Sequence, residues 1–217
     1  MPASLGDESQ ENKASSSALS AASPRAPDDR AYRSRGWVAL VFLAPFGLAA
    51  LVMQPPFPAS SAGALALDSL GWAAFFAYAM LRAWATLYLG GNKSLVLQTA
   101  GPYSLCRNPL YLGSGALALA VTAFLGSVLF AGAVAVVAAA YAALVVPAEE
   151  RLLLTRFGDG YHAYTHVTPR FLPRQRRSIG PAVVPVDIGR WLVEAGRVGR
   201  ALLFILVLRA IASARPF

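Results

Sequence analysis

The chain is poor in charged residues and in cysteine. Only 14% of its 217 residues are charged, whereas 56% are hydrophobic. An average soluble domain carries about 25% charged residues. A soluble protein of this length cannot cover its surface with so few charges, so the composition excludes an ordinary cytosolic enzyme and indicates a protein of the lipid bilayer. Cys106 is the single cysteine, which excludes a disulfide-stabilised scaffold.

Lysine is also scarce, although the chain is strongly basic. Nineteen basic residues, of which only two are Lys, stand against eleven acidic ones and give a net charge of +8. A basic excess is typical of proteins that bind nucleic acid or an anionic membrane surface. The long apolar runs favour the membrane. No stretch combines basic and aromatic residues as nucleic-acid readers do, so we expect no nucleic-acid partner.

The apolar runs predict an all-α polytopic membrane protein. After a polar tail at residues 1–35, whose composition indicates disorder, four segments approach the length of about 20 residues that a span requires. These are residues 37–53, 68–88, 109–125 and 128–146. Asp68 is the expected N-cap of the second segment, and Gly90-Gly91 is its expected end. Gly126-Ser127 is a tight turn, so the third and fourth segments form a helical hairpin. For residues 188–213 we prefer an amphipathic helix on the inner leaflet to a fifth span.

The positions of Arg and Lys predict the orientation. Basic residues precede the first span, lie between the second and third, and follow the fourth, whereas the loop 54–67 and the turn 126–127 have none. Basic residues stay on the cytoplasmic side. We therefore expect segments 91–108 and 149–190 to share the cytoplasmic face, where a soluble cofactor would bind. The Arg- and Ala-rich composition favours a bacterial inner membrane.

The sequence GPYSLCRNPLYLG at residues 101–113 predicts a turn followed by a helix start. Asn108 is a good N-cap and Pro109 suits the first helical position. The free amides and positive dipole end of a helix N-terminus attract a carboxylate or a phosphate. Arg107 would add a donor there, or would serve only as a positive-inside anchor.

Glu149-Glu150 follows the fourth span directly. These carboxylates either form salt bridges with neighbouring arginines or bind a cation. Successive helical residues point about 100° apart, so the two are not expected to face the same ligand. His162 and His166 have helical spacing but no third ligand nearby, and we expect no metal site. Arg82, inside the second span, either has a function there or reaches the cytoplasmic surface with its long side chain.

These fragments, in their order, resemble one family. GPYSLCRNPLYLG, a helical hairpin, EERLL, FGDGYHAY and VTPRFLP are similar to the pattern of the membrane methyltransferases that include isoprenylcysteine carboxyl methyltransferase and the phospholipid N-methyltransferases. The resemblance covers about residues 90–175. It implies that S-adenosyl-L-methionine binds at the cytoplasmic ends of the last spans. By motif position it also implies cofactor contacts, which are Leu95, Val96, Leu97, Gln98, Tyr103, Asn108, Pro109, Leu110, Tyr111 and Glu149.

The chemistry of these residues agrees with that expectation. The cofactor carboxylate suits the helix N-terminus at residues 108–111, Glu149 suits a cationic end, and the faces of Tyr103 and Tyr111 suit the sulfonium. Most family members have His where this chain has Asn108, and Asn cannot titrate near neutral pH. This departure favours a carboxylate or another acceptor that needs no base, unless His162 supplies one. No catalytic residue is assigned.

We therefore expect a membrane S-adenosylmethionine-dependent methyltransferase whose lipid-like or membrane-embedded acceptor enters laterally between spans. Its parts would be a tail (1–35), a core (36–175) with the cofactor site in 95–111 and 149–173, and a basic linker with a C-terminal helix (176–217). Two alternatives remain. One is a membrane NADPH-dependent reductase of the sterol type, and the other is a non-catalytic relative that acts as a membrane partner protein.

Overall fold

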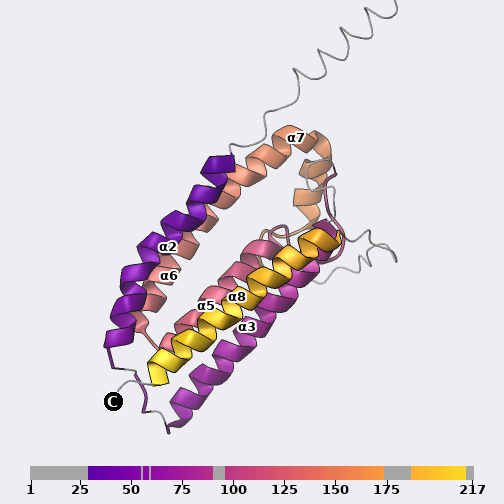
Figure 1. Cartoon of the computed structure of the whole chain (residues 1–217). Coiled ribbons are helices and arrows are strands. Elements are labelled where there is room, and N and C mark those ends of the chain that lie inside the picture. The colour runs from indigo at the N-terminus through magenta and orange to yellow at the C-terminus, as the bar shows by residue number, and fades with distance from the viewer. Residues whose placement is uncertain (1–28, 55, 59, 90–95, 174–186, 214–217) are drawn as a thin grey trace, which may run out of the picture. The chain divides into compact units, whose positions relative to one another are not determined.

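The computed structural model describes residues 29–54, 56–58, 60–89, 96–173 and 187–213, and every regular element among them is helical (Figure 1). The elements in chain order are α2 (Asp29–Val52), α3 (Ala62–Leu89), α4 (Pro102–Leu105), α5 (Pro109–Leu125), α6 (Val128–Ala140), the π-helical turn η1 (Tyr141–Val145), α7 (Val146–Val167) and α8 (Ile188–Ser213). The all-helical class is thus confirmed for this part of the chain. Contacts divide the chain into units 1–40 and 41–217, and the packing below concerns the second unit.

Two helices begin earlier than the sequence predicts. α3 starts at Ala62, because the Ser61 hydroxyl accepts a hydrogen bond from the Ala64 amide and so caps the helix. Asp68 therefore lies inside α3, and its prediction as an N-cap is wrong. α2 starts at Asp29, so residues 29–35 are helical rather than part of a disordered tail. Arg and Ala are good helix formers and extend the helix beyond the apolar segment. Residues 1–28 and Gly90-Gly91 lie outside the described part.

The tight turn between α5 and α6 is confirmed. Gly126 ends α5 with φ 60°, a left-handed conformation that glycine adopts without strain. Ser127 then caps α6, because its hydroxyl accepts a hydrogen bond of 3.2 Å from the Phe130 amide. α5 covers residues 109–125 as expected.

The fourth helical segment continues well past residue 146. α6, η1 and α7 follow one another without a break from Val128 to Val167. The chain bends at Gly158, whose φ of 51° and ψ of −129° are not helical, and α7 turns back on itself there (Figure 1). The bend divides α7 into a first arm (146–157) and a second arm (159–167). The first arm remains helical although it is charged, because its Glu, Arg and Leu residues all have high helix propensity.

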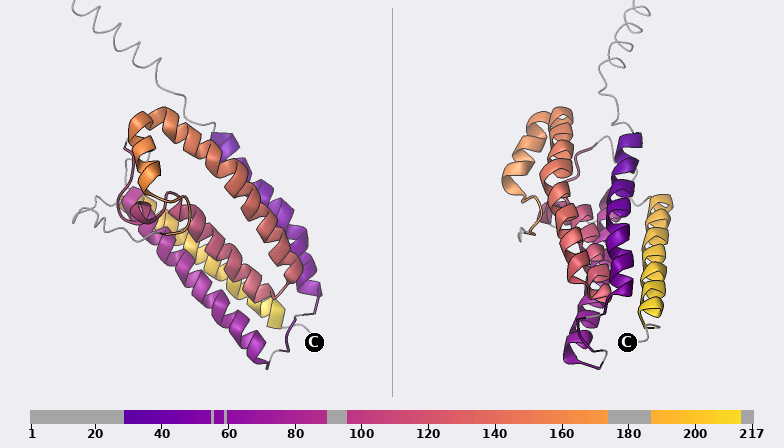
Figure 2. Two further views of the ribbon diagram at one scale, coloured as in Figure 1. Left: turned by 180° about the vertical axis from the view of Figure 1, so that it is seen from behind. Right: turned by 90° about the vertical axis from the view of Figure 1, so that its left-hand side faces the viewer.

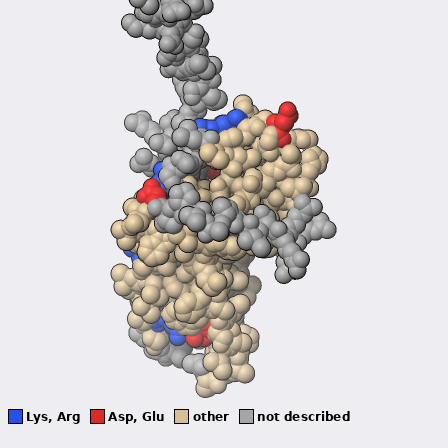
Figure 3. Space-filling model, turned by 90° about the vertical axis from the view of Figure 1, so that its right-hand side faces the viewer, with Lys and Arg blue, Asp and Glu red and all other residues tan. Residues whose placement is uncertain are grey.

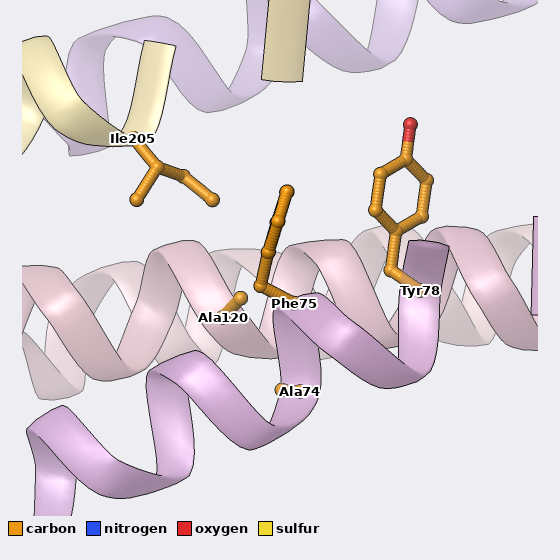
Figure 4. Close-up of a cluster of buried hydrophobic side chains, with 5 residues drawn as sticks. All are labelled: Ala74, Phe75, Tyr78, Ala120 and Ile205. Carbon is orange, nitrogen blue, oxygen red and sulfur yellow. The ribbon is translucent and has the colours of Figure 1, made fainter. Parts of the chain in front are cut away.

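Helices α3, α5 and α8 run side by side (Figures 1 and 2). Their shared core consists of Ala74, Phe75 and Tyr78 from α3, Ala120 from α5 and Ile205 from α8 (Figure 4). A second apolar cluster, made of Ala50, Leu125, Phe130 and Leu208, joins the end of α2 to α5, α6 and α8.

Two ion pairs show that α8 runs antiparallel to α3. Near the start of α8, Glu194 accepts a hydrogen bond of 2.5 Å from Arg82. Near its end, Arg209 pairs with Asp68 and lies over the rings of Trp72 and Phe124. The pairs are 15 residues apart on α8 and so about 22 Å apart along the helix.

α8 therefore packs along the bundle, which differs from the separate inner-leaflet helix that we preferred. The reason lies in its pattern: Glu194, Val198, Ala201, Ile205 and Leu208 share one helical face and pack on α3 and α5. The same contacts decide the role of Arg82, which is the partner of a buried carboxylate and does not reach outward.

The exposed surface of the unit is largely apolar. Leu203 and Phe204 of α8 are exposed while Glu194 is buried, and Figure 3 shows uncharged side chains over most of one face. Two helical stretches, Ala62–Leu89 and Val128–Val167, are long and apolar enough to cross a membrane, and Gly36–Val52 and Pro109–Leu125 are apolar but shorter. These features indicate a membrane protein, and the number of spans stays a prediction.

Candidate functional site

The N-terminus of α5 is held by a buried turn. Gly101 has φ 59°, and a Cβ atom at this position would come within 2.5 Å of the Tyr88 ring. This close approach and the positive φ both require glycine. The short helix α4 follows, and Asn108 then precedes α5 in the N-cap position with Pro109 as the first helical residue, as predicted.

Asn108 does not cap α5 with its side chain. Its amide instead donates to Glu150 Oε1 at 3.4 Å and to the carbonyl oxygen of Arg170 at 3.2 Å. The backbone amides of Tyr111 and Leu112 bond to the Asn108 carbonyl, and Pro109 has no N–H. The Leu110 amide is therefore the first-turn donor for which the described residues provide no acceptor.

Glu150 is buried at the centre of a charged network. Arg170 donates to both of its carboxylate oxygens, with the shortest contact 2.6 Å from Nη2 to Oε2. Arg107 Nε lies 3.5 Å from Glu150 Oε1. This arrangement ties α7 to the start of α5 and to the segment after α7. Glu150 therefore forms salt bridges, which is the first of the two alternatives considered for the acidic pair.

Glu149 points to a different neighbour. Its Oε1 accepts a hydrogen bond of 2.8 Å from the Tyr111 hydroxyl. The ring of Tyr111 also meets the ring of Tyr141 edge to face, with centroids 6.0 Å apart. Glu149 and Tyr111 are each partly exposed. The adjacent carboxylates thus face different partners, as their helical spacing predicts.

The second arm of α7 closes over the turn before α5. The Tyr164 hydroxyl donates to the Tyr103 carbonyl oxygen at 2.6 Å, and the Arg107 amide donates to the Pro169 carbonyl at 2.9 Å. Burial raises the pKa of the Tyr164 hydroxyl, and burial together with the nearby Glu150 carboxylate raises the pKa of Tyr161 to about 12. Both tyrosines are therefore neutral hydrogen-bond donors at physiological pH.

Two hollows are well defined in the described surface. One of about 240 Å³ lies in the bend of α7 and is lined by Glu150, Tyr161, His162, Thr165, Arg170 and three residues of the first arm. The other, of about 140 Å³, lies at the opposite end of the bundle beside Asp68 and Gly126. Neither includes Asn108, Tyr111 or Glu149. Both are smaller than the roughly 300–1,000 Å³ of typical ligand pockets.

The structure brings some of the predicted site residues together. Tyr111 meets Glu149, and Asn108 contacts the adjacent Glu150, while Pro109 and Leu110 form the first turn of α5 between them. Tyr103 is buried, and its backbone carbonyl oxygen accepts the hydrogen bond from Tyr164. Val96, Leu97 and Gln98 lie in an irregular segment before α4, and Leu95 lies outside the described residues.

Three neighbours of this group were not predicted as site residues: Glu150, Arg170 and Tyr141. Glu150 and Arg170 stand in the EERLL and VTPRFLP fragments, so the sequence offered a signal for both. Tyr141 stands in an apolar run without any motif. His162 and His166 have ring centroids 4.6 Å apart. No group of three or more potential metal ligands occurs among the residues that the structure describes.

Comparisons with known proteins give a family and two relatives. The profile of the phospholipid methyltransferase family matches residues 59–160. The nickel-cobalt-cadmium resistance protein NccN of Alcaligenes xylosoxydans xylosoxydans is 37% identical over 93 residues. The cobalt-zinc-cadmium resistance protein CzcN of Cupriavidus metallidurans is 40% identical over 105 residues.

Each of these matches covers 43% of this chain and 43% of the relative, so the chain aligns with less than half the length of the curated proteins it matches. No solved structure matches. The matched family segment contains α3, the start of α5 with its Asn108–Tyr111 turn, the hairpin and the Glu149-Glu150 pair. Over residues 59–160 the chain is similar to the phospholipid methyltransferase family, which agrees with the resemblance found in the sequence motifs.

Proposed function

We propose that this protein is an S-adenosylmethionine-dependent membrane methyltransferase that acts on a lipid-like or membrane-embedded acceptor. The observation that carries the proposal is the contact of Tyr111 with Glu149 beside the open first turn of α5. The family match supports the reaction type, and the apolar helices support the membrane setting. By the positions of Arg and Lys, the site faces the cytoplasm.

The residues present fit the chemical groups of the cofactor. The Leu110 amide and the N-terminal dipole of α5 suit its carboxylate. The Glu149 carboxylate suits its ammonium group or its sulfonium, and the ring of Tyr111 offers a π face to a cation. Neither hollow reaches Tyr111 or Glu149.

Bound S-adenosylmethionine would supply an electrophilic methyl carbon, which passes to the acceptor while the carbon–sulfur electron pair stays on the sulfur of S-adenosylhomocysteine. The protein's part is to align the acceptor with that methyl group and to exclude water. Glu149 and Tyr111 hold the donor side. The network of Glu150, Arg107 and Arg170 fixes α5 relative to α7 and keeps that alignment.

Asn108 is a positioning residue in this scheme. Its amide is already engaged with Glu150 and the Arg170 carbonyl, and an Asn side chain does not titrate near neutral pH. The acceptor therefore arrives as a nucleophile, such as a carboxylate, or loses its proton to another group. The metal-resistance names of the two relatives do not specify a methyl acceptor.

Calorimetric titration of the purified full chain with S-adenosylhomocysteine tests the proposal. We expect binding, and a loss of about 10- to 100-fold in affinity for Glu149→Gln or Tyr111→Phe, because hydrogen bonds to charged groups contribute about 1.5–3 kcal/mol. Asp159→Asn, which removes an exposed carboxylate from the second arm of α7, serves as the control and leaves the affinity unchanged. Absence of binding at millimolar ligand by folded protein would overturn the proposal.

Three further measurements separate the alternatives. NADPH competes with S-adenosylhomocysteine if the protein is a reductase and does not compete if it is a methyltransferase. Membrane lipid extracts incubated with methyl-labelled S-adenosylmethionine and the protein acquire label only if it is catalytic. A cellular function that survives both Glu149→Gln and Tyr111→Phe would instead identify a non-catalytic partner protein.

A further inference from the structure

The π-helical turn η1 interrupts the longest helical stretch of the chain. It spans Tyr141–Val145, between α6 and α7, and none of its residues is buried. Leu144 is 68% exposed, so the turn borders the apolar surroundings of the bundle. π turns are rare and occur frequently at functional sites.

The turn changes which side chains share a face. Tyr141 and Glu149 are eight residues apart, which in an uninterrupted α-helix is about 800°, or roughly 80° beyond two full turns. A π turn accommodates one extra residue without adding a turn, so the offset becomes about 20° in the opposite sense. The extra residue therefore brings Tyr141 and Glu149 to nearly the same face.

Both of these residues contact the same side chain of α5. The Tyr141 ring meets the Tyr111 ring edge to face at 6.0 Å. Glu149 accepts the hydrogen bond from the Tyr111 hydroxyl at 2.8 Å. Tyr111 is thus held at its ring by η1 and at its hydroxyl by α7. In a regular α-helix over residues 141–149, Tyr141 and Glu149 would point in different directions, and the two could not contact Tyr111 at the same time.

We propose that Tyr141, carried by the π turn, is a positioning residue that holds Tyr111 against Glu149 in the methyl-transfer site. This inference rests on the proposed function. Tyr141 is thus an aromatic partner of Tyr111.

Substitution of Tyr141 tests the role of its ring. Tyr141→Leu removes the edge-to-face contact. The kcat for transfer of methyl label from S-adenosylmethionine to membrane lipid extract then falls by about 10- to 100-fold, the effect expected when a reacting group is misplaced by about 1 Å. S-adenosylhomocysteine affinity falls by less than about fivefold, because this variant keeps the Tyr111 hydroxyl together with Glu149 and the α5 amide. Tyr141→Phe keeps the ring and restores kcat to within about threefold of the original protein. Phe76→Leu, at an exposed aromatic residue of α3, is the matched control.

A double-substitution cycle shows whether Tyr141 acts through Tyr111. In a Tyr111→Leu background, Tyr141→Leu has no further effect on kcat if the two residues act as a unit. Multiplicative losses in the double variant would overturn the inference. So would a Tyr141→Leu variant with kcat within twofold of the original, or a Tyr141→Phe variant as impaired as Tyr141→Leu.

Deletion of Ala143 tests the register argument separately. The deletion removes the extra residue, restores α-helical spacing and turns Glu149 away from Tyr111. We expect S-adenosylhomocysteine affinity to fall as it does for Glu149→Gln, while Ala143→Ser keeps it. Undiminished binding by the deletion variant would refute the register argument. If the unmodified protein binds no S-adenosylhomocysteine, the proposed function fails first. Binding by the unmodified protein together with unaffected Tyr141 variants refutes only this inference.

Discussion

The ion pair between Arg82 and Glu194 allows a stringent test of the packing of α8. The side chain of Glu194 is 5% exposed and that of Arg82 17%. Glu194→Leu leaves the Arg82 charge in a largely apolar setting without its partner. Removing one member of a buried pair costs about 3–5 kcal/mol, and the residual exposure of Arg82 indicates the lower end, about 3 kcal/mol. Arg197, the second partner of Glu194, is half exposed and contributes less than about 1 kcal/mol.

A double-mutant cycle isolates the pair. Arg82→Met costs a similar amount, because it leaves the Glu194 carboxylate with only Arg197. The variant with both substitutions recovers most of the loss, since apolar residues of similar volume often replace a buried ion pair at little net cost. The assay is the unfolding of the full chain in mixed micelles with increasing denaturing detergent. Asp187→Asn is the control, because Asn retains the cap on the Arg190 amide and the Asp187–Arg190 pair is solvent-exposed.

The outcome of the cycle is decisive in both directions. A coupling energy of about 2–3 kcal/mol between Arg82 and Glu194 supports direct pairing between α3 and α8. Additive effects, or single substitutions that each cost less than about 1 kcal/mol, would show that the two helices do not pack as described.

Three further predictions concern the site and the turn before it. Gly101→Ala lowers the unfolding free energy by at least about 1–2 kcal/mol in the same assay, because φ at this position is positive and the Tyr88 ring leaves no room for a Cβ atom. Gly115→Ala is the control: this glycine lies in α5 with open space around it, and the substitution raises the unfolding free energy by about 0.5–1 kcal/mol. The raised pKa of Tyr161 keeps its hydroxyl protonated in the folded protein until about pH 12. The stability that this residue contributes is therefore complete below pH 10 and is lost between pH 10 and 12. The absorbance of ionised tyrosine at 295 nm, measured on the folded protein at pH 11, is then unchanged by Tyr161→Phe. Glu150→Gln lowers the unfolding free energy by about 1–3 kcal/mol, because it replaces the buried carboxylate that accepts from Arg170 with a neutral amide. An unchanged unfolding free energy would contradict the network of Glu150, Arg107 and Arg170.

Local signals in the sequence predicted local structure well. Pro109 at the first helical position and Gly126 after the last fixed α5 to residues 109–125, because both act within a few residues of their own positions. The turn at Ser127 is equally local. The spacing of Glu149 and Glu150 was sufficient to predict that they face different neighbours, since the angle between successive helical residues does not depend on the rest of the fold.

Contacts between distant segments were not predictable in the same way. The sequence left open whether the acidic pair forms salt bridges or binds a cation, because Arg170 as the main partner of Glu150 depends on the bend at Gly158. The bend brings the segment after α7 back toward α5. The π turn has no signature in the apolar run at residues 141–145, so the pairing of Tyr141 with Tyr111 could not be anticipated.

The charges inside α3 connect the C-terminal helix to the family segment. Asp68 and Arg82 lie in a helix that is apolar and long enough to cross a membrane, where unpaired charges are costly. Both find their partners, Arg209 and Glu194, on α8, which lies beyond the family match that ends at residue 160. The two helices thus carry complementary charges at corresponding depths, and the antiparallel arrangement is the one that pairs both. α8 is therefore part of the folded core, and α3 without it would expose an Asp and an Arg to an apolar environment.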